Sequence, residues 1–156
     1  MKLGRLPCFL VVIIGLSGAL SPNLGLACSC GGYAPWVTTE EIVERYDAVF
    51  WGQVDTVHLE GFAKVATLRV FAVWKGDVPR EVQVRTPAEG TACGVGFTPG
   101  QPYLVFATLD SNELYGTHLC DPTTVHERAT CSIQSLGQPI AVLSHSAVLD
   151  LAISNG

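Results

Sequence analysis

The chain has 156 residues, of which 48% are apolar and 15% charged, and its formal net charge is −5. The length suits one domain, and the negative charge argues against nucleic acid or an anionic membrane as the main partner, because both need a basic face. Six cysteines are more than usual, and they favour disulfides if the chain is exported.

The first 27 residues have the pattern of a secretory signal peptide. Lys2 and Arg5 form a short positive region, and the apolar run 9–20 follows it. The small residues of Gly25-Leu26-Ala27 then occupy positions −3 and −1 of a cut before Cys28. We therefore expect 1–27 to be removed and the protein to be secreted, either extracellular or periplasmic. The alternative is an uncleaved membrane anchor.

Removal of 1–27 would leave a single domain over residues 28–156. Its charge would be −7, from seven bases and fourteen acids, because the removed part holds two bases and no acid. Five cysteines would remain, so one of them must be unpaired, modified or bonded to a partner. They are Cys28, Cys30, Cys93, Cys120 and Cys131. A weaker cut site after Ala19 would start the chain at Leu20 instead.

The first half of the mature chain is expected to hold one short helix and three strands. Thr38 and the acids that follow it predict a helix from Thr38 to Tyr46, with a hydroxyl cap. Alternating or β-rich runs predict strands over 48–57, 62–74 and 81–85, with a turn at Lys75–Asp77. One face of the second strand is expected to carry Phe62, Ala66, Leu68, Val70 and Trp74.

The second half is expected to add two strands and a closing helix. Tyr103–Thr108 is a continuous apolar run, Asp110–Asn112 is a hairpin signal, and Leu114–Cys120 is the returning strand. Apolar residues within 137–152 predict a helix at the end of the chain. Five strands with a helix at each end predict a mainly β fold, a small five-stranded Greek-key barrel.

Several short motifs, taken together, resemble a known inhibitor family. They are Cys28-Ser29-Cys30, Phe50–Val54, Trp74–Gly76, Thr91–Gly94, Phe97–Val105 and Cys120. This set looks like the N-terminal domain of the tissue inhibitors of metalloproteinases, a netrin-like module with an OB-type barrel. The resemblance covers residues 28–121, and it implies an OB-type barrel held by disulfides.

The resemblance also implies how the cysteines pair. In that family the two N-terminal cysteines bond to the two later ones, which would join Cys28 to Cys93 and Cys30 to Cys120. Cys131 would be left unpaired, because the sequence offers no counterpart for the third bridge that the family has in this domain.

Inhibition of a zinc metalloproteinase is the function that the resemblance implies. The free α-amine and the carbonyl oxygen of mature Cys28 would chelate the catalytic zinc of the target and displace its water. Ser29 would enter the adjoining pocket of the target, and Ala92, Cys93 and Gly94 would form a flanking contact strip. The domain would need no cofactor and no metal ion of its own, since its partner supplies the zinc.

The main alternative is an extracellular binding module without inhibitory activity. Netrin-like barrels also occur as adaptors, and Tyr33–Trp36 is a candidate interaction ridge beside the N-terminus. Such a module could be a lipoprotein tethered to the membrane through Cys28, which would leave an even number of cysteines. The match to a lipobox is poor, because Leu26 is at −2 and Gly25 at −3. Lipidation would exclude zinc chelation.

Metal binding and catalysis find less support in the sequence. Cys28-x-Cys30 could bind a soft metal ion, and a zinc cluster could form from His118, Cys120, His126 and Cys131, but the spacings fit no standard pattern. Ser135, Ser144 and Ser146 lack a nucleophile-elbow context. We therefore expect the protein not to be an enzyme.

Overall fold

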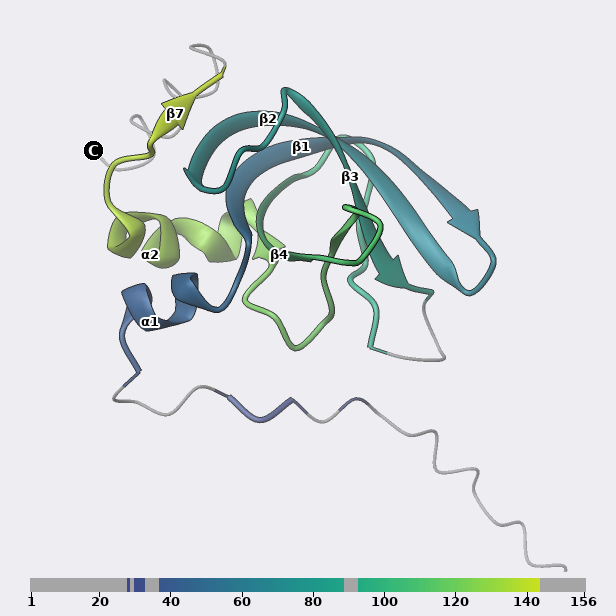
Figure 1. The fold of residues 1–156 in the computed structure, drawn as a ribbon, viewed down its shortest axis with the longest axis horizontal. Coiled ribbons are helices and arrows are strands. Elements are labelled where there is room, and N and C mark those ends of the chain that lie inside the picture. The colour runs from purple at the N-terminus through teal and green to yellow at the C-terminus, as the bar shows by residue number, and fades with distance from the viewer. Residues whose placement is uncertain (1–27, 29, 33–36, 89–92, 144–156) are drawn as a thin grey trace, which may run out of the picture.

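The computed structural model describes residues 28, 30–32, 37–88 and 93–143, and these form a mainly β structure (Figure 1). Its elements are α1 (Thr39–Glu44), β1 (Ala48–Glu60), β2 (Ala63–Lys75), β3 (Glu81–Pro87), β4 (Pro102–Leu109), β5 (Tyr115–Gly116), β6 (Thr124–Val125), α2 (His126–Leu136) and β7 (Ala141–Val142). The prediction of a mainly β fold is thereby confirmed.

Five of the strands are hydrogen-bonded into a ring. β1 pairs with β2 on one side and with β4 on the other, and both pairings are antiparallel. β2 continues to β3, β3 pairs with β5 in parallel, and β5 pairs with β4 to close the circle. The ring therefore has the order β1-β2-β3-β5-β4. The two-residue strands β6 and β7 add to β4 and β2.

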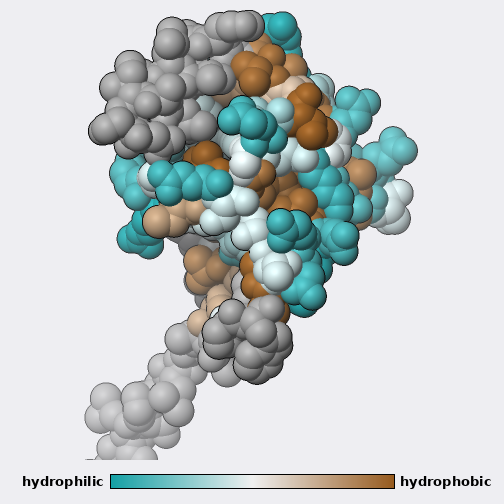
Figure 2. Space-filling view, turned by 90° about the vertical axis from the view of Figure 1, so that its left-hand side faces the viewer, coloured by the Kyte–Doolittle hydropathy of each residue, from teal (hydrophilic) through white to brown (hydrophobic). Residues whose placement is uncertain are grey.

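Two hydrophobic clusters occupy the two faces of this ring. All five ring strands contribute to the first cluster, which includes Phe50, Leu68 and Val105, so it fills the interior. The second cluster holds Trp51 and Phe106 on the outer face and is covered by α1 and α2. Both helices lie on the same side of the ring (Figure 1). Figure 2 views that side, where hydrophobic side chains lie among hydrophilic ones.

The side-chain alternation in β2 changes at Phe71. Gly52 of β1 pairs with Val70 and Trp51 pairs with Ala72, so Phe71 is an extra residue in the ladder. A bulge of this kind moves the following residues to the opposite face. Ala66, Leu68 and Val70 therefore face the interior as predicted, whereas Trp74 belongs to the outer cluster. Phe62 is 91% exposed in the turn before β2, so its predicted place on the buried face was wrong.

The first helix follows its sequence signal. The Thr38 hydroxyl accepts the Glu41 N–H at 3.2 Å, and the Thr38 N–H donates to the Glu41 carboxylate at 2.8 Å. This reciprocal pair is a capping box. The helix ends at Glu44, two residues before the predicted end.

The predictions for the last third of the chain were largely wrong. The returning strand is only two residues long; the Thr117 N–H still donates to the Arg85 carbonyl of β3 at 3.0 Å, and the strand does not continue to Cys120. A helix occupies 126–136, where none was predicted, and Gly137 follows it with φ 68°. A closing helix was expected over 137–152. The described part of that range, 137–143, contains β7 instead of a helix, and the remainder lies outside the described residues.

Candidate functional site

Two disulfides attach the start of the described chain to one end of the ring. Cys28 is bonded to Cys93 with a Cα–Cα distance of 5.4 Å, and Cys30 is bonded to Cys120 with a distance of 5.1 Å. These are the pairs that the resemblance implied. Cys131 is free and exposed on α2. Ser29 and Ala92 lie outside the described residues, as does the Tyr33–Trp36 segment.

The loop that carries Cys93 is fastened to the ring just after that residue. The Val95 N–H donates to the buried Thr86 hydroxyl at 2.8 Å. The Tyr103 hydroxyl donates to the Gly96 carbonyl at 2.9 Å and accepts the Thr98 N–H at 3.2 Å. Thr86 of β3 and Tyr103 of β4 thus hold the loop 93–98 against the ring, which fixes the position of Cys93.

The Thr86 contact can be tested by substitution. Thr86 is 1% exposed, so Thr86→Val keeps its shape but leaves the Val95 N–H without its acceptor. We expect the free energy of unfolding to fall by about 1–2 kcal/mol in urea denaturation, the cost of one buried unpaired donor. Thr56→Val on exposed β1 is the matched control and should change it by less than about 0.5 kcal/mol. Equal effects of the two substitutions would show that the bond contributes nothing.

The backbone around Cys93 adopts an unusual conformation. Cys93 has φ 48°, in the left-handed region that residues with a side chain seldom occupy. The next residue, Gly94, lies so close to Pro87 that a Cβ there would be 1.8 Å from the Pro87 carbonyl oxygen. The disulfide-bonded loop thus touches the backbone at the end of β3, and only glycine fits at the contact.

A second loop, residues 117–121, carries Cys120. The Asp121 carboxylate accepts the His118 N–H at 2.7 Å and the Tyr46 hydroxyl at 3.1 Å. It also accepts the Thr117 hydroxyl at 3.3 Å and lies 3.2 Å from the His118 ring. Through Tyr46 this network connects the Cys120 loop to the residues just before β1.

The two loops meet each other directly. The Leu119 N–H donates to the Cys93 carbonyl at 2.6 Å. Since Cys28 is bonded to one loop and Cys30 to the other, these two cysteines, only two positions apart in the sequence, attach the chain start to both loops. We call loops 93–98 and 117–121 the two-loop platform. It is the candidate functional site, with Cys28 half-buried on it.

Sequence reasoning found the cysteines of the platform but not the residues that position them. Thr86 follows Val82 and Val84 on the inward face of β3. A polar residue at an inward position of that alternating series could have been used to predict a buried hydrogen bond there. Asp121 and Tyr103 gave no comparable signal, because their hydrogen bonds are made to loop residues that no periodic pattern of the sequence marks, and in one case to Tyr46 across 75 positions.

Other kinds of site receive no support from the described residues. No group of three or more His, Cys, Asp or Glu side chains in the described ranges could hold a metal ion. Cys120 of the predicted zinc cluster is in a disulfide, as are both cysteines of Cys28-x-Cys30. No helix among the described residues is long and apolar enough to cross a membrane, and the disulfides are compatible with an extracellular location.

The comparisons with known proteins do not assign a family. No model of a protein family matches the chain, and no curated protein matches it. The two-loop platform is therefore the basis for the proposed function.

Proposed function

We propose that this protein is an exported inhibitor of zinc metalloproteinases that acts through the N-terminus of mature Cys28. The observation that carries the proposal is the attachment of Cys28 and Cys30 to two loops that hydrogen-bond to each other. A chain start held in this way has little freedom left to lose on binding. Pre-organisation of this kind favours tight binding, because less conformational entropy is lost.

The proposed chemistry uses two atoms of Cys28. Its α-amine and carbonyl oxygen would chelate the catalytic zinc of the target and displace the water that the metal activates. The amine must be neutral to bind, and the ordinary pKa of an α-amine, near 8, makes this inexpensive at neutral pH. Ser29 would enter the pocket beside the zinc, and Ala92, Cys93 and Gly94 would contact the target alongside.

We also propose that the ring of strands is an OB-type Greek-key barrel. The ring order β1-β2-β3-β5-β4 and the parallel pairing of β3 with β5 support this assignment. In such a barrel the platform would lie at the end where β3 leaves the sheet, next to the chain start.

The disulfide at Cys28 argues for a free amine rather than a lipid anchor. A lipoprotein carries its lipid on the sulfur of its first cysteine, whereas the Cys28 sulfur is bonded to Cys93. The intact mass of the exported protein tests this point. We expect a chain that begins at Cys28 and lacks four hydrogens relative to the reduced form. A mass raised by acyl chains would exclude chelation.

Insertion of one alanine before Cys28 tests the mechanism. The insertion moves the α-amine by about 3.8 Å, while misplacement by 1 Å already costs catalytic groups about 100-fold. We expect inhibition of a panel of zinc proteases to weaken at least about 100-fold, with both disulfides intact by mass. Undiminished inhibition by the insertion variant would reject chelation. Absence of inhibition by the unmodified protein with a free Cys28 would favour the binding module.

A further inference from the structure

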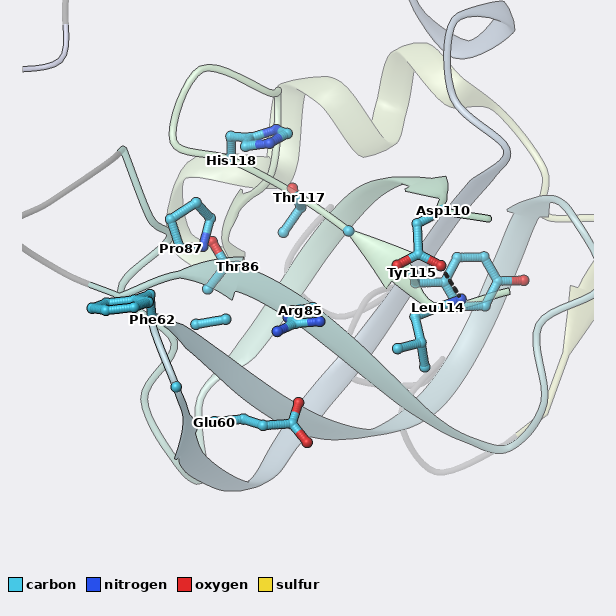
Figure 3. A pocket seen from close by; sticks show the side chains of 13 residues that line it. Glu60, Phe62, Arg85, Thr86, Pro87, Asp110, Leu114, Tyr115, Thr117 and His118 are labelled. Atoms are coloured by element: carbon cyan, nitrogen blue, oxygen red, sulfur yellow. Dashed lines mark hydrogen bonds between the residues drawn. The ribbon is translucent and has the colours of Figure 1, made fainter. Parts of the chain in front are cut away.

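A groove of about 500 Å³ lies on the outer face of the ring beside the platform (Figure 3). Its floor is the end of β3 around Arg85, and its two sides are the turn between β1 and β2 and the turn between β4 and β5. His118 also lines the groove and is two residues from Cys120, so the groove adjoins the two-loop platform. None of the proposed zinc-binding atoms lies in it.

The guanidinium of Arg85 is the unusual feature of the groove floor. Arg85 is exposed, and its side chain makes no hydrogen bond and no ion pair with any residue that the structure describes. By contrast, Arg69 donates to Asp55 at 2.8 Å and to Gln53 at 3.2 Å. The donors of Arg85 are therefore available to a ligand. A guanidinium presents parallel N–H groups that match a carboxylate.

Apolar side chains lie on both sides of Arg85. In Figure 3, Arg85 stands between Phe62 and Leu114. Phe62 is 91% exposed and Leu114 is 36% exposed, so both offer apolar surface to the solvent. Aromatic residues and arginine are enriched in protein–protein interfaces relative to the rest of the protein surface. The groove thus combines one guanidinium, which no described side chain hydrogen-bonds, with an apolar contact at either end.

The rim of the groove carries negative charge, which restricts the kind of anion it can accept. The Asp110 carboxylate accepts the N–H groups of Leu114 and Asn112 at 3.0 and 2.7 Å. These bonds, and to a smaller extent the positive charge of Arg85, hold the pKa of Asp110 below its ordinary value, so Asp110 stays ionised at neutral pH. Glu60 lines the opposite side, and the whole chain carries −5. A polyanion would be repelled, whereas a single carboxylate can reach Arg85.

We propose that this groove binds an extended peptide segment of a partner protein, with an aspartate or glutamate flanked by apolar residues two positions away on each side. In an extended chain residues i−2, i and i+2 share one face, so the segment presents apolar, carboxylate and apolar groups in turn. The carboxylate pairs with Arg85, and the apolar groups contact Phe62 and Leu114. This binding is independent of zinc chelation, since it needs no free amine at Cys28.

A synthetic peptide provides the test on the exported protein. The probe is a five-residue peptide, blocked at both ends, of the sequence leucine-serine-glutamate-serine-leucine. The control peptide is the same except that glutamine replaces the central glutamate. In NMR titrations we expect the glutamate peptide to shift the signals of Phe62, Arg85 and Leu114. It should bind about tenfold more tightly than the glutamine peptide, and Arg85→Ala should remove that difference.

Arg80→Ala is the matched control, because Arg80 is also exposed and lies outside the groove. It should leave the peptide affinity within about twofold. Equal binding of the two peptides, or binding that Arg85→Ala does not weaken, would overturn the proposal. Tighter, Arg85-dependent binding of a heparin hexasaccharide would also overturn it, since the groove would then select polyanions.

Discussion

Replacing Cys30 and Cys120 together with serine should lower the free energy of unfolding by about 3.5 kcal/mol. The bridge spans 90 residues, but the Cys28–Cys93 bridge already shortens the path between its ends. That path runs two residues back to Cys28, across the bridge, and on to Cys120, about 29 residues in all. In the chain-entropy model a loop of this length is worth about 3.5 kcal/mol, less than the roughly 4.6 kcal/mol of an isolated 90-residue loop.

Urea denaturation without reductant measures the loss of unfolding free energy in the Cys30/Cys120 variant, and Cys131→Ser is the control. Cys131 is free and exposed, so its replacement should change the free energy of unfolding by less than about 0.5 kcal/mol. Removing both bridges should cost about 8 kcal/mol, which is comparable to the whole stability of a domain. A loss below about 1 kcal/mol for the Cys30/Cys120 pair would mean that the unfolded chain is constrained in another way.

The strands could be predicted from the sequence because their signals are local. The alternation in Glu81–Arg85 and the apolar run at Tyr103–Thr108 each describe a strand that needs no distant partner to be recognised. The capping residues of α1 are local as well. α2 was not predicted, because its apolar signal is short and the rest of its sequence is mostly polar. Ala129, Ile133 and Leu136 do follow the helical spacing i, i+4, i+7, and these are the residues that pack against the outer cluster.

The face of a residue after a bulge could not be predicted either. Nothing in the residues around Phe71 marks the extra position, which appears only in the pairing of β2 with β1.

The candidate site likewise has residues that the sequence identifies and residues that only the folded structure identifies. Cys28, Cys93 and Cys120 could be named because cysteines in an exported chain are candidates for disulfides. Their pairing was implied by the family resemblance. The residues that fix the loops act through hydrogen bonds that form only in the folded chain, and one of them joins Asp121 to Tyr46 across 75 positions.

Gly94→Ala should destabilise the protein and displace the Cys93 loop. The added Cβ would lie 1.8 Å from the Pro87 carbonyl oxygen and 2.9 Å from its carbonyl carbon. Pro87 ends β3 and is held by pairing with Ala63, so the loop must be the part that moves. Overpacking of this kind costs about 2–3 kcal/mol. Because the loop carries Cys93, we expect the displacement to reach both the Val95–Thr86 and the Leu119–Cys93 hydrogen bonds.

Amide hydrogen exchange at Val95 and Leu119 measures the displacement, and urea denaturation measures its cost. Both amides should exchange faster in Gly94→Ala, because the loop movement takes the Val95 N–H away from the Thr86 hydroxyl and the Cys93 carbonyl away from the Leu119 N–H. Gly116→Ala is the matched control, since its Cβ would meet nothing closer than the Thr108 carbonyl oxygen at 3.8 Å. It should change the free energy of unfolding by less than about 1 kcal/mol. If the two alanine variants behaved alike, the contact with Pro87 could not be what positions Cys93, and the rigidity of the chain start would have to come from the disulfides alone.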